Sequence, residues 1–253
     1  MSGEATKGKA GTPGKKYPRP KLAIDVVLIS VGLDGSLLTA AIARPDQDAW
    51  ALPGTYVHEG ESAEDAAARA LRDKAMIDNA ALEQLHTFSD PGRDSRDWVV
   101  SVAYFALVPL VTLAGASIAP GANTFGVRVD WEGESGGPAH LAGSADGPAG
   151  SGLAAGMLAF DHADILGRAV LRLRGKAWYS GALLGLVEPE FTLAEIQVVY
   201  EAVLGRKLSK SAFRRRILAS GLIAPTGTKR EGPTVAFRPP ALYRAAERKE
   251  PSR

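Results

Sequence analysis

The sequence predicts two folded parts: a mixed α/β domain, followed by a small module of two helices and a β-hairpin. Three observations support this prediction. β-type runs alternate with helical segments over residues 22–187, apolar residues recur at helical spacing after residue 191, and charge is divided unevenly along the chain. With 253 residues, the chain is long enough to bury the cores of two modest domains.

The α/β domain is predicted from short apolar runs bounded by turn residues. An Ala-rich helix from Ser62 to Ile77 interrupts these runs and begins at a capping box, because Asp65 follows Ser62 three residues later. The Asp and Gly residues of segment 32–35 suit a hairpin turn. The predicted strands are residues 24–31, 37–43, 49–52, 85–89 and 98–108.

The rest of this domain, assigned to residues 22–187, is less regular. Residues 133–156 are rich in Gly, Ala, Pro and Ser and have no periodicity, so we expect a mobile loop there. A helix should follow from residue 161 to 178, capped by Asp161 with Asp164 in its first turn. Residues 1–21 carry a net charge of +5 and almost no apolar side chains, which predicts a disordered basic tail.

The C-terminal module is assigned to residues 191–246. Thr192 and Glu195 form a capping box for an amphipathic helix that ends at Gly205, and a second helix is expected over residues 209–220. A β-hairpin follows, with an apolar run at 222–224, a turn at 226–232 and a return strand at 234–237. Two helices and a basic hairpin in this order predict a winged helix.

The charge distribution suggests what this module binds. Residues 191–253 carry a net charge of +8, whereas residues 22–190 carry −11, the layout expected when one part of a chain meets nucleic acid. We therefore predict binding of double-stranded DNA, with a solvated helical appendage as the alternative. The candidate DNA contacts are Lys210, Ser211, Arg214, Arg215 and Arg216 on the second helix and Lys229 and Arg230 in the wing.

Composition limits the cellular setting. The chain contains no cysteine, which excludes disulfides and cysteine-bound zinc and fits a reducing compartment. No apolar run reaches transmembrane length, and no signal-type segment follows the Lys-rich start. We expect a soluble, cytoplasmic protein without a membrane partner.

Residues 52–62 and the helix after them resemble the Nudix box, a loop-helix-loop with the pattern G-x5-E-x7-R-E-U-x-E-E-x-G-U. The pattern is kept at Glu61, Arg69, Leu71 and Ile77. It is lost at Thr55, Ala70, Asp73, Lys74 and Met76. In that family, helix carboxylates hold the divalent metal that supports diphosphate hydrolysis, so no catalytic residue, metal site or required cofactor is expected here. The alternative is an active ADP-ribose pyrophosphatase with an accessory C-terminal domain.

A degenerate Nudix domain followed by a winged helix resembles the Nudix-related transcriptional regulators of NAD metabolism, the NrtR family. The resemblance is strongest in the strings FTLAEIQ at 191–197, YE at 200–201, LG at 204–205 and FRR at 213–215. It implies a Nudix-like mixed-sheet α/β (α+β) sandwich with a C-terminal winged helix. It also implies a homodimeric repressor of NAD synthesis or salvage genes, bound to palindromic operators and released by ADP-ribose.

The loop at 89–98 is similar to one that ADP-ribose-specific Nudix proteins place near their ligand. Arg93 and Arg96 in this loop can neutralise a diphosphate, and Trp50 or Trp98 can stack on adenine. Surface Arg–Asp pairs are the alternative interpretation of the two arginines. The candidate effector-binding residues are Trp50, Glu61, Arg69, Arg93, Arg96 and Trp98, for ADP-ribose or a related NAD metabolite. A scaffold that binds nucleotides or proteins without DNA is a third possibility.

Overall fold

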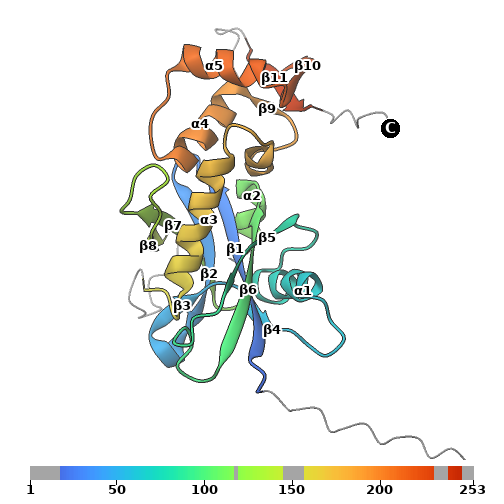
Figure 1. The fold of residues 1–253 in the computed structure, drawn as a ribbon. Helices are drawn as coiled ribbons and strands as arrows, with labels where there is room; N and C mark the ends of the chain where they lie inside the picture. Colours follow the sequence, from blue (N-terminus) through green and yellow to red (C-terminus); the bar gives the residue numbers. More distant parts are fainter. Residues whose placement is uncertain (1–17, 117–118, 145–156, 231–238, 247–253) are drawn as a thin grey trace, which may run out of the picture.

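A mixed eight-stranded sheet forms the centre of the molecule (Figure 1). The computed structural model describes residues 18–116, 119–144, 157–230 and 239–246. The main strand order is β5-β6-β1-β2-β7-β8, with β3 beside β2 and β4 beside β1; only the β1–β6 pair is parallel among the described strands. The strands are β1 (Lys21–Val31), β2 (Leu37–Arg44), β3 (Ala49–Ala51), β4 (Gly54–Tyr56), β5 (Leu82–Phe88), β6 (Val99–Leu107), β7 (Ala122–Val129) and β8 (Ala139–Ser144).

Helices cover both faces of this sheet. Successive side chains of β1 point to opposite sides, so each face of the strand contributes apolar residues to a different cluster. Ile24, Val26 and Leu28 face α1 (Ala63–Ala75) and α2 (Leu110–Ala116). Val27 and Ile29 pack in the cluster that contains α3 (His162–Lys176). Figure 1 shows α1 and α3 on opposite sides of the sheet. Two short 3-10 helices, η1 (Pro45–Gln47) and η2 (Ala182–Leu186), complete this part.

The C-terminal part is a winged helix, as the sequence predicts. It contains α4 (Leu193–Leu204), α5 (Lys210–Ala219) and a three-stranded sheet ordered β10-β11-β9, from β9 (Phe191–Thr192), β10 (Ile223–Lys229) and β11 (Ala241–Ala245). The predicted capping box is present: Glu195 N–H donates to Thr192 Oγ1, and the Glu195 carboxylate accepts from Thr192 N–H. Gly205 ends α4 with φ +67°, a left-handed conformation that glycine adopts without strain.

The two parts share one hydrophobic cluster. Apolar side chains of α3, such as Leu173 and Ala177, belong to the same cluster as Ile196 and Tyr200 of α4 and Phe213 of α5. Figure 1 shows α3 running along the sheet toward the base of the winged helix. The connection between the two parts is therefore a packed interface.

The structure corrects several sequence predictions. Within the predicted mobile loop 133–156, residues 139–144 form strand β8, while 145–156 lie outside the described residues. The helix α2, the strands β4, β7 and β9 and the short helix η1 were not predicted either. In the wing, β10 continues to Lys229 through the start of the predicted turn, and the return strand described is β11; the predicted strand 234–237 lies outside the described residues.

The start of α3 also differs from the prediction. Asp161 occupies the N-cap position but makes no capping hydrogen bond with its side chain, because its carboxylate binds Arg93. By contrast, Ser62 does cap α1 by accepting a hydrogen bond from Asp65 N–H. Among the described helices, none has the length and apolar character needed to cross a membrane.

Because α3 packs closely on the β7–β8 connection, alanine substitutions at two glycines of α3 should change the free energy of unfolding in opposite directions. A Cβ at Gly167 would lie 2.0 Å from the Gly137 carbonyl oxygen, whereas one at Gly175 meets no heavy atom within 4 Å. Gly167→Ala should lower the free energy of unfolding by about 1 to 3 kcal/mol through overpacking. Gly175→Ala should raise it by about 0.5 kcal/mol through helix propensity. Urea unfolding of both variants is the measurement, and equal effects would contradict this packing.

Candidate functional site

A cavity of about 260 Å³ lies beside β1, between α1 and the start of α3. It collects several polar and aromatic side chains from segments far apart in the sequence. Four of its lining residues are cationic: Arg44, Lys74, Arg93 and Arg96. Its other polar or aromatic lining residues are Asp25, Thr55, Tyr56, Asp94, Phe160 and His162.

Arg69 and Glu61 hold the loop before α1 in place. The two side chains form a bidentate pair, with Arg69 Nε 2.8 Å from Glu61 Oε1 and Nη2 2.9 Å from Oε2. The Arg69 guanidinium also donates to Thr55 Oγ1 and the Tyr56 carbonyl. Hydrogen bonding from Arg69 and from His58 N–H lowers the pKa of Glu61 to about 2. Both residues, predicted as effector contacts, are therefore engaged in a structural clamp beside the cavity.

Arg93 forms the centre of a buried ion network at the cavity. Its side chain is only 4% exposed, and its Nε and Nη2 donate to both oxygens of Asp161 at 2.9 and 2.7 Å. Nη2 also donates to Asp25 Oδ2 at 3.1 Å. Arg93 thus binds two carboxylates that lie 68 residues from it in opposite directions along the chain.

Asp25 is held ionised in this network. Burial would raise its pKa, but the His162 ring, the hydrogen bond from Ser101 Oγ and the Arg93 guanidinium lower it from 3.8 to about 2. Leu52 N–H donates to His162 Nδ1 at 2.9 Å, so that nitrogen is unprotonated and the ring proton lies on Nε2, 3.3 Å from Asp25 Oδ1.

The mouth of the cavity carries cations over an aromatic ring. Arg96 lies 4.6 Å and Arg44 5.5 Å from the centre of the Phe160 ring. Arg96 pairs with Asp94, and Arg44 with Asp46. Lys74 is the one lining cation that has no carboxylate within 4.0 Å among the described residues. Its charge is therefore available to an anionic ligand.

The two predicted stacking residues lie elsewhere. Trp50 is 5% exposed and packs edge-on against Phe125 at 4.7 Å, so the structure places it in the core and gives it no face for a ligand. Trp98 is 47% exposed but does not line the cavity. The aromatic lining residues are Tyr56 and Phe160, which sequence reasoning missed. Asp25, a lone carboxylate within an apolar strand, was the signal in the sequence that could have located the site.

The residues at the degenerate Nudix positions do not fit a metal ion. Ala70 is buried against the sheet and offers no oxygen, and Glu61 is paired with Arg69. No group of three or more His, Asp or Glu side chains that could hold a metal occurs in the described ranges. Hard divalent cations need several oxygen ligands, so the chemistry of this donor set disfavours them.

The second candidate site is the exposed face of α5. Phe213 and Ile217 are buried, and the opposite face presents Lys210, Ser211, Arg214 and Arg215 to solvent. None of these three cations has a carboxylate within 4.0 Å in the described part of the chain, and the same holds for Lys229 at the end of β10. A row of free cations on an exposed helix suits the phosphates and base edges of DNA.

Two of the predicted DNA contacts are already engaged within the protein. The Arg216 guanidinium lies 3.7 Å from the centre of the Trp178 ring. Arg230 pairs with the Glu195 carboxylate, and its Nη2 donates to the Glu190 carbonyl at 3.4 Å. Their positions therefore favour a structural role over a free DNA contact.

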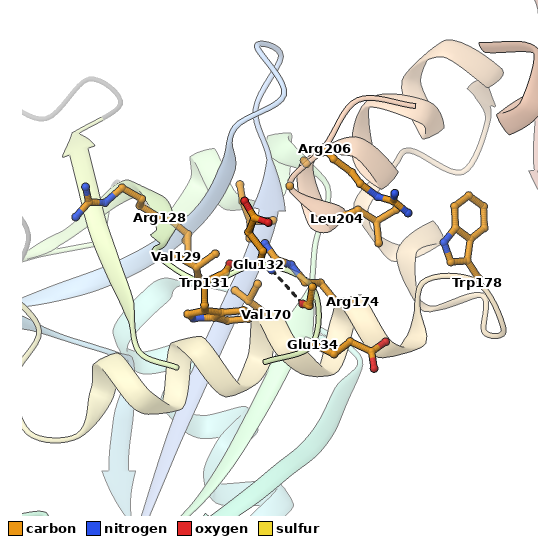
Figure 2. A pocket seen from close by; sticks show the side chains of 15 residues that line it. Arg128, Val129, Trp131, Glu132, Glu134, Val170, Arg174, Trp178, Leu204 and Arg206 are labelled. Atoms are coloured by element: carbon orange, nitrogen blue, oxygen red, sulfur yellow. Dashed lines mark hydrogen bonds between the residues drawn. The ribbon is translucent and has the colours of Figure 1, made fainter. Parts of the chain in front are cut away.

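A larger cavity, of about 790 Å³, lies where the sheet domain meets α4 (Figure 2). Arg174 of α3 is buried at its edge and donates to the carbonyl oxygens of Val203, Trp131 and Gly133. Burial lowers its pKa, and the carbonyls at the end of α4 provide the compensating partial negative charge. Arg174 thus links the sheet domain to α4 through hydrogen bonds.

Comparisons with known proteins agree with this architecture. A NUDIX domain model matches residues 19–121, and a model of the NrtR DNA-binding winged helix domain matches residues 183–245. The ADPR responsive transcriptional repressor NtrR of Acinetobacter baylyi is 34% identical over 235 residues, which cover 91% of this chain and 84% of the relative.

Two solved structures are similar over most of the chain. A MutT/nudix family protein from Enterococcus faecalis has a TM-score of 0.70 at 25% identity, with 92% of this chain and 89% of the other covered. The Shewanella oneidensis NrtR in complex with a 27mer DNA has a TM-score of 0.66 at 29% identity, with 88% and 93% covered.

The buried carboxylate predicts a specific acid dependence of stability. Because the folded state lowers the pKa of Asp25, this residue stabilises the fold above pH 3.8, and the contribution is lost as the pH falls toward 2. The wild type should therefore lose about 2 kcal/mol more than Asp25→Asn over this interval. Urea unfolding from pH 5 downward measures the difference, and parallel pH profiles would contradict the ion network.

Proposed function

The chain belongs to the NrtR family, in which a NUDIX domain precedes a winged-helix DNA-binding domain, and from this premise we propose that it is a transcriptional repressor responding to ADP-ribose. The observation that carries the proposal is the combination of two sites in one fold: an exposed cationic helix, and a cationic cavity in which the described residues form no group able to hold a metal ion. The proposed target genes are those of NAD synthesis or salvage.

The winged helix supplies the DNA-binding surface in this proposal. α5 is the recognition helix, with Arg214 and Arg215 placed to meet base edges or phosphates of the major groove. Lys210, Ser211 and Lys229 are proposed as further contacts. The relative from Acinetobacter is named as a repressor, and the Shewanella NrtR structure contains DNA. By analogy, this chain is proposed to bind a palindromic operator as a homodimer.

The cavity beside β1 is the proposed effector site. A diphosphate carries several negative charges, and Lys74, Arg93 and Arg96 bring cations to the cavity from α1 and from the loop before β6. Tyr56 and Phe160 provide aromatic faces beside them. A ligand with a diphosphate and an aromatic base, such as ADP-ribose, suits this combination.

Hydrolysis of the effector is not part of the proposal. Metal-assisted hydrolysis needs oxygen ligands that polarise the phosphate and activate water. Ala70 and Lys74 occupy the helix positions at which the Nudix pattern has carboxylates, and Glu61 is committed to Arg69. The site is therefore suited to binding a diphosphate and poorly suited to cleaving it.

The decisive experiment is a titration of full-length protein onto duplexes that it selects from a random pool, with and without ADP-ribose. Specific binding, at two chains per duplex and reversed by ADP-ribose, is expected. Arg215→Ala should lose about 1 to 3 kcal/mol of binding free energy on the selected duplex and little on random DNA. Lys229→Ala should weaken binding to both kinds of DNA. Absence of duplex binding, with phosphate bonds of ADP-ribose cleaved when Mg²⁺ is added, would refute the proposal in favour of a hydrolase.

The free cation in the cavity predicts how ADP-ribose is held. Lys74→Ala should weaken ADP-ribose binding roughly tenfold to a hundredfold, because hydrogen bonds to charged groups contribute about 1.5 to 3 kcal/mol. Arg72→Ala is the matched control, since Arg72 lies on the same helix, contacts Asp73 and does not line the cavity. Calorimetry in EDTA and in Mg²⁺ should give the same wild-type affinity; an affinity that requires Mg²⁺ would contradict the role of Lys74.

A further inference from the structure

Helix α3 joins the two candidate sites directly. Its N-terminal residues Asp161 and His162 belong to the ion network at the effector cavity, and Trp178, two residues after its end, contacts the recognition helix. Fifteen residues at 1.5 Å each make α3 about 22 Å long. It lies in the stretch between the two family-model matches, residues 122–182, so neither match assigns it a role.

The contact at the end of α3 fixes the orientation of α5. The Trp178 ring lies 3.7 Å from the Arg216 guanidinium, 4.7 Å from the Tyr200 ring and 6.2 Å from the Phe213 ring. Arg174, one turn earlier, donates to the Val203 carbonyl at the end of α4. A displacement of α3 must therefore move both helices of the winged helix or break these contacts.

The contact at the start of α3 is the one that an anionic ligand disturbs. Arg93 already binds two carboxylates, so a diphosphate that approaches its guanidinium meets repulsion from both. Asp25 is additionally held by Ser101 and His162. The Asp161 carboxylate accepts hydrogen bonds from Arg93 alone within the described ranges. Asp161 is therefore the carboxylate that an anionic ligand displaces from Arg93.

A released Asp161 has an alternative position available. It is the N-cap residue of α3, with φ −92° and ψ 19°, and rotation into the extended region would let its carboxylate accept from the first-turn N–H groups. The preceding residue, Phe160, has φ +57°, a strained conformation for a side chain of this size. The start of α3 can thus exist in two arrangements, one clamped to Arg93 and one capped.

We propose that ADP-ribose displaces Asp161 from Arg93, and that α3 passes this change through Trp178 to Arg216 on the recognition helix. Trp178 and Arg216 are positioning residues in this proposal: they orient α5 and need not touch the operator. The inference rests on the proposed function, because it requires both an effector and a DNA duplex.

The first test measures coupling at the Trp178–Arg216 contact. The measured quantity is a ratio: the duplex Kd with saturating ADP-ribose divided by the duplex Kd without it. For the wild type this ratio should be at least about five. In Trp178→Leu and Arg216→Lys the ratio should fall toward one, while ADP-ribose affinity without DNA stays within about twofold. Trp178→Phe, which keeps an aromatic face, should retain part of the ratio.

A matched control separates coupling from direct DNA contact. Arg214→Lys, on the same helix but without an aromatic partner among the described residues, should change both Kd values by one factor and leave the ratio unchanged. If Trp178→Leu does not fold by circular dichroism, Arg216→Lys decides, since Arg216 is exposed. If these variants keep the wild-type ratio, the proposed coupling through Trp178 and Arg216 is overturned and the repressor proposal stands. If ADP-ribose does not change the duplex Kd of the wild type, both proposals are overturned.

The second test examines the contact with Arg93. Asp161→Asn should bind ADP-ribose at least about fivefold more tightly and the duplex correspondingly more weakly in the absence of ADP-ribose, because the mutation favours the released arrangement. Asp164→Asn, in the same turn and without an ion pair among the described residues, is the control and should change neither. Weaker ADP-ribose binding by Asp161→Asn would contradict the exchange at Arg93.

Discussion

The burial of α3 is the constraint on which the rest of the structure depends. One side of this helix covers the sheet, and its end packs against α4, so a single hydrophobic cluster extends from β1 to α5. Because packed cores move between discrete arrangements and do not deform gradually, this continuity links the cavity to the recognition helix more firmly than a flexible connection could. Arg174 strengthens the link by satisfying carbonyl groups on both sides of the junction.

The Nudix-like segment shows how a catalytic framework can persist as a structural one. Glu61 and Arg69 keep their places in the pattern and hold the loop before α1 through paired hydrogen bonds. Ala70 turns a ligand position into a packing position against the sheet. Lys74 brings a positive charge to the lining of the cavity, and in the proposed function this charge favours binding of a diphosphate without the metal that hydrolysis needs.

Local patterns in the sequence predicted the fold well where the signal was local. The capping box at Thr192 and the apolar spacing of α4 correspond to the observed helix. β7 and β8 escaped prediction because their segments resemble loops and gain their stability from strand pairing, β7 with β2 and β8 with β7. The partners of Asp161 and Arg216 could not be read from the sequence, since each contact joins residues that are distant along the chain.

The shared core has a consequence for how such proteins diversify. The matched winged-helix region begins at residue 183, but Trp178, which packs on Tyr200 and Phe213, lies before it. A recombination event at the sequence boundary would leave this tryptophan behind and pair the incoming module with a foreign surface. An exchange of DNA-binding modules that keeps this packing should therefore carry the end of α3 together with the module.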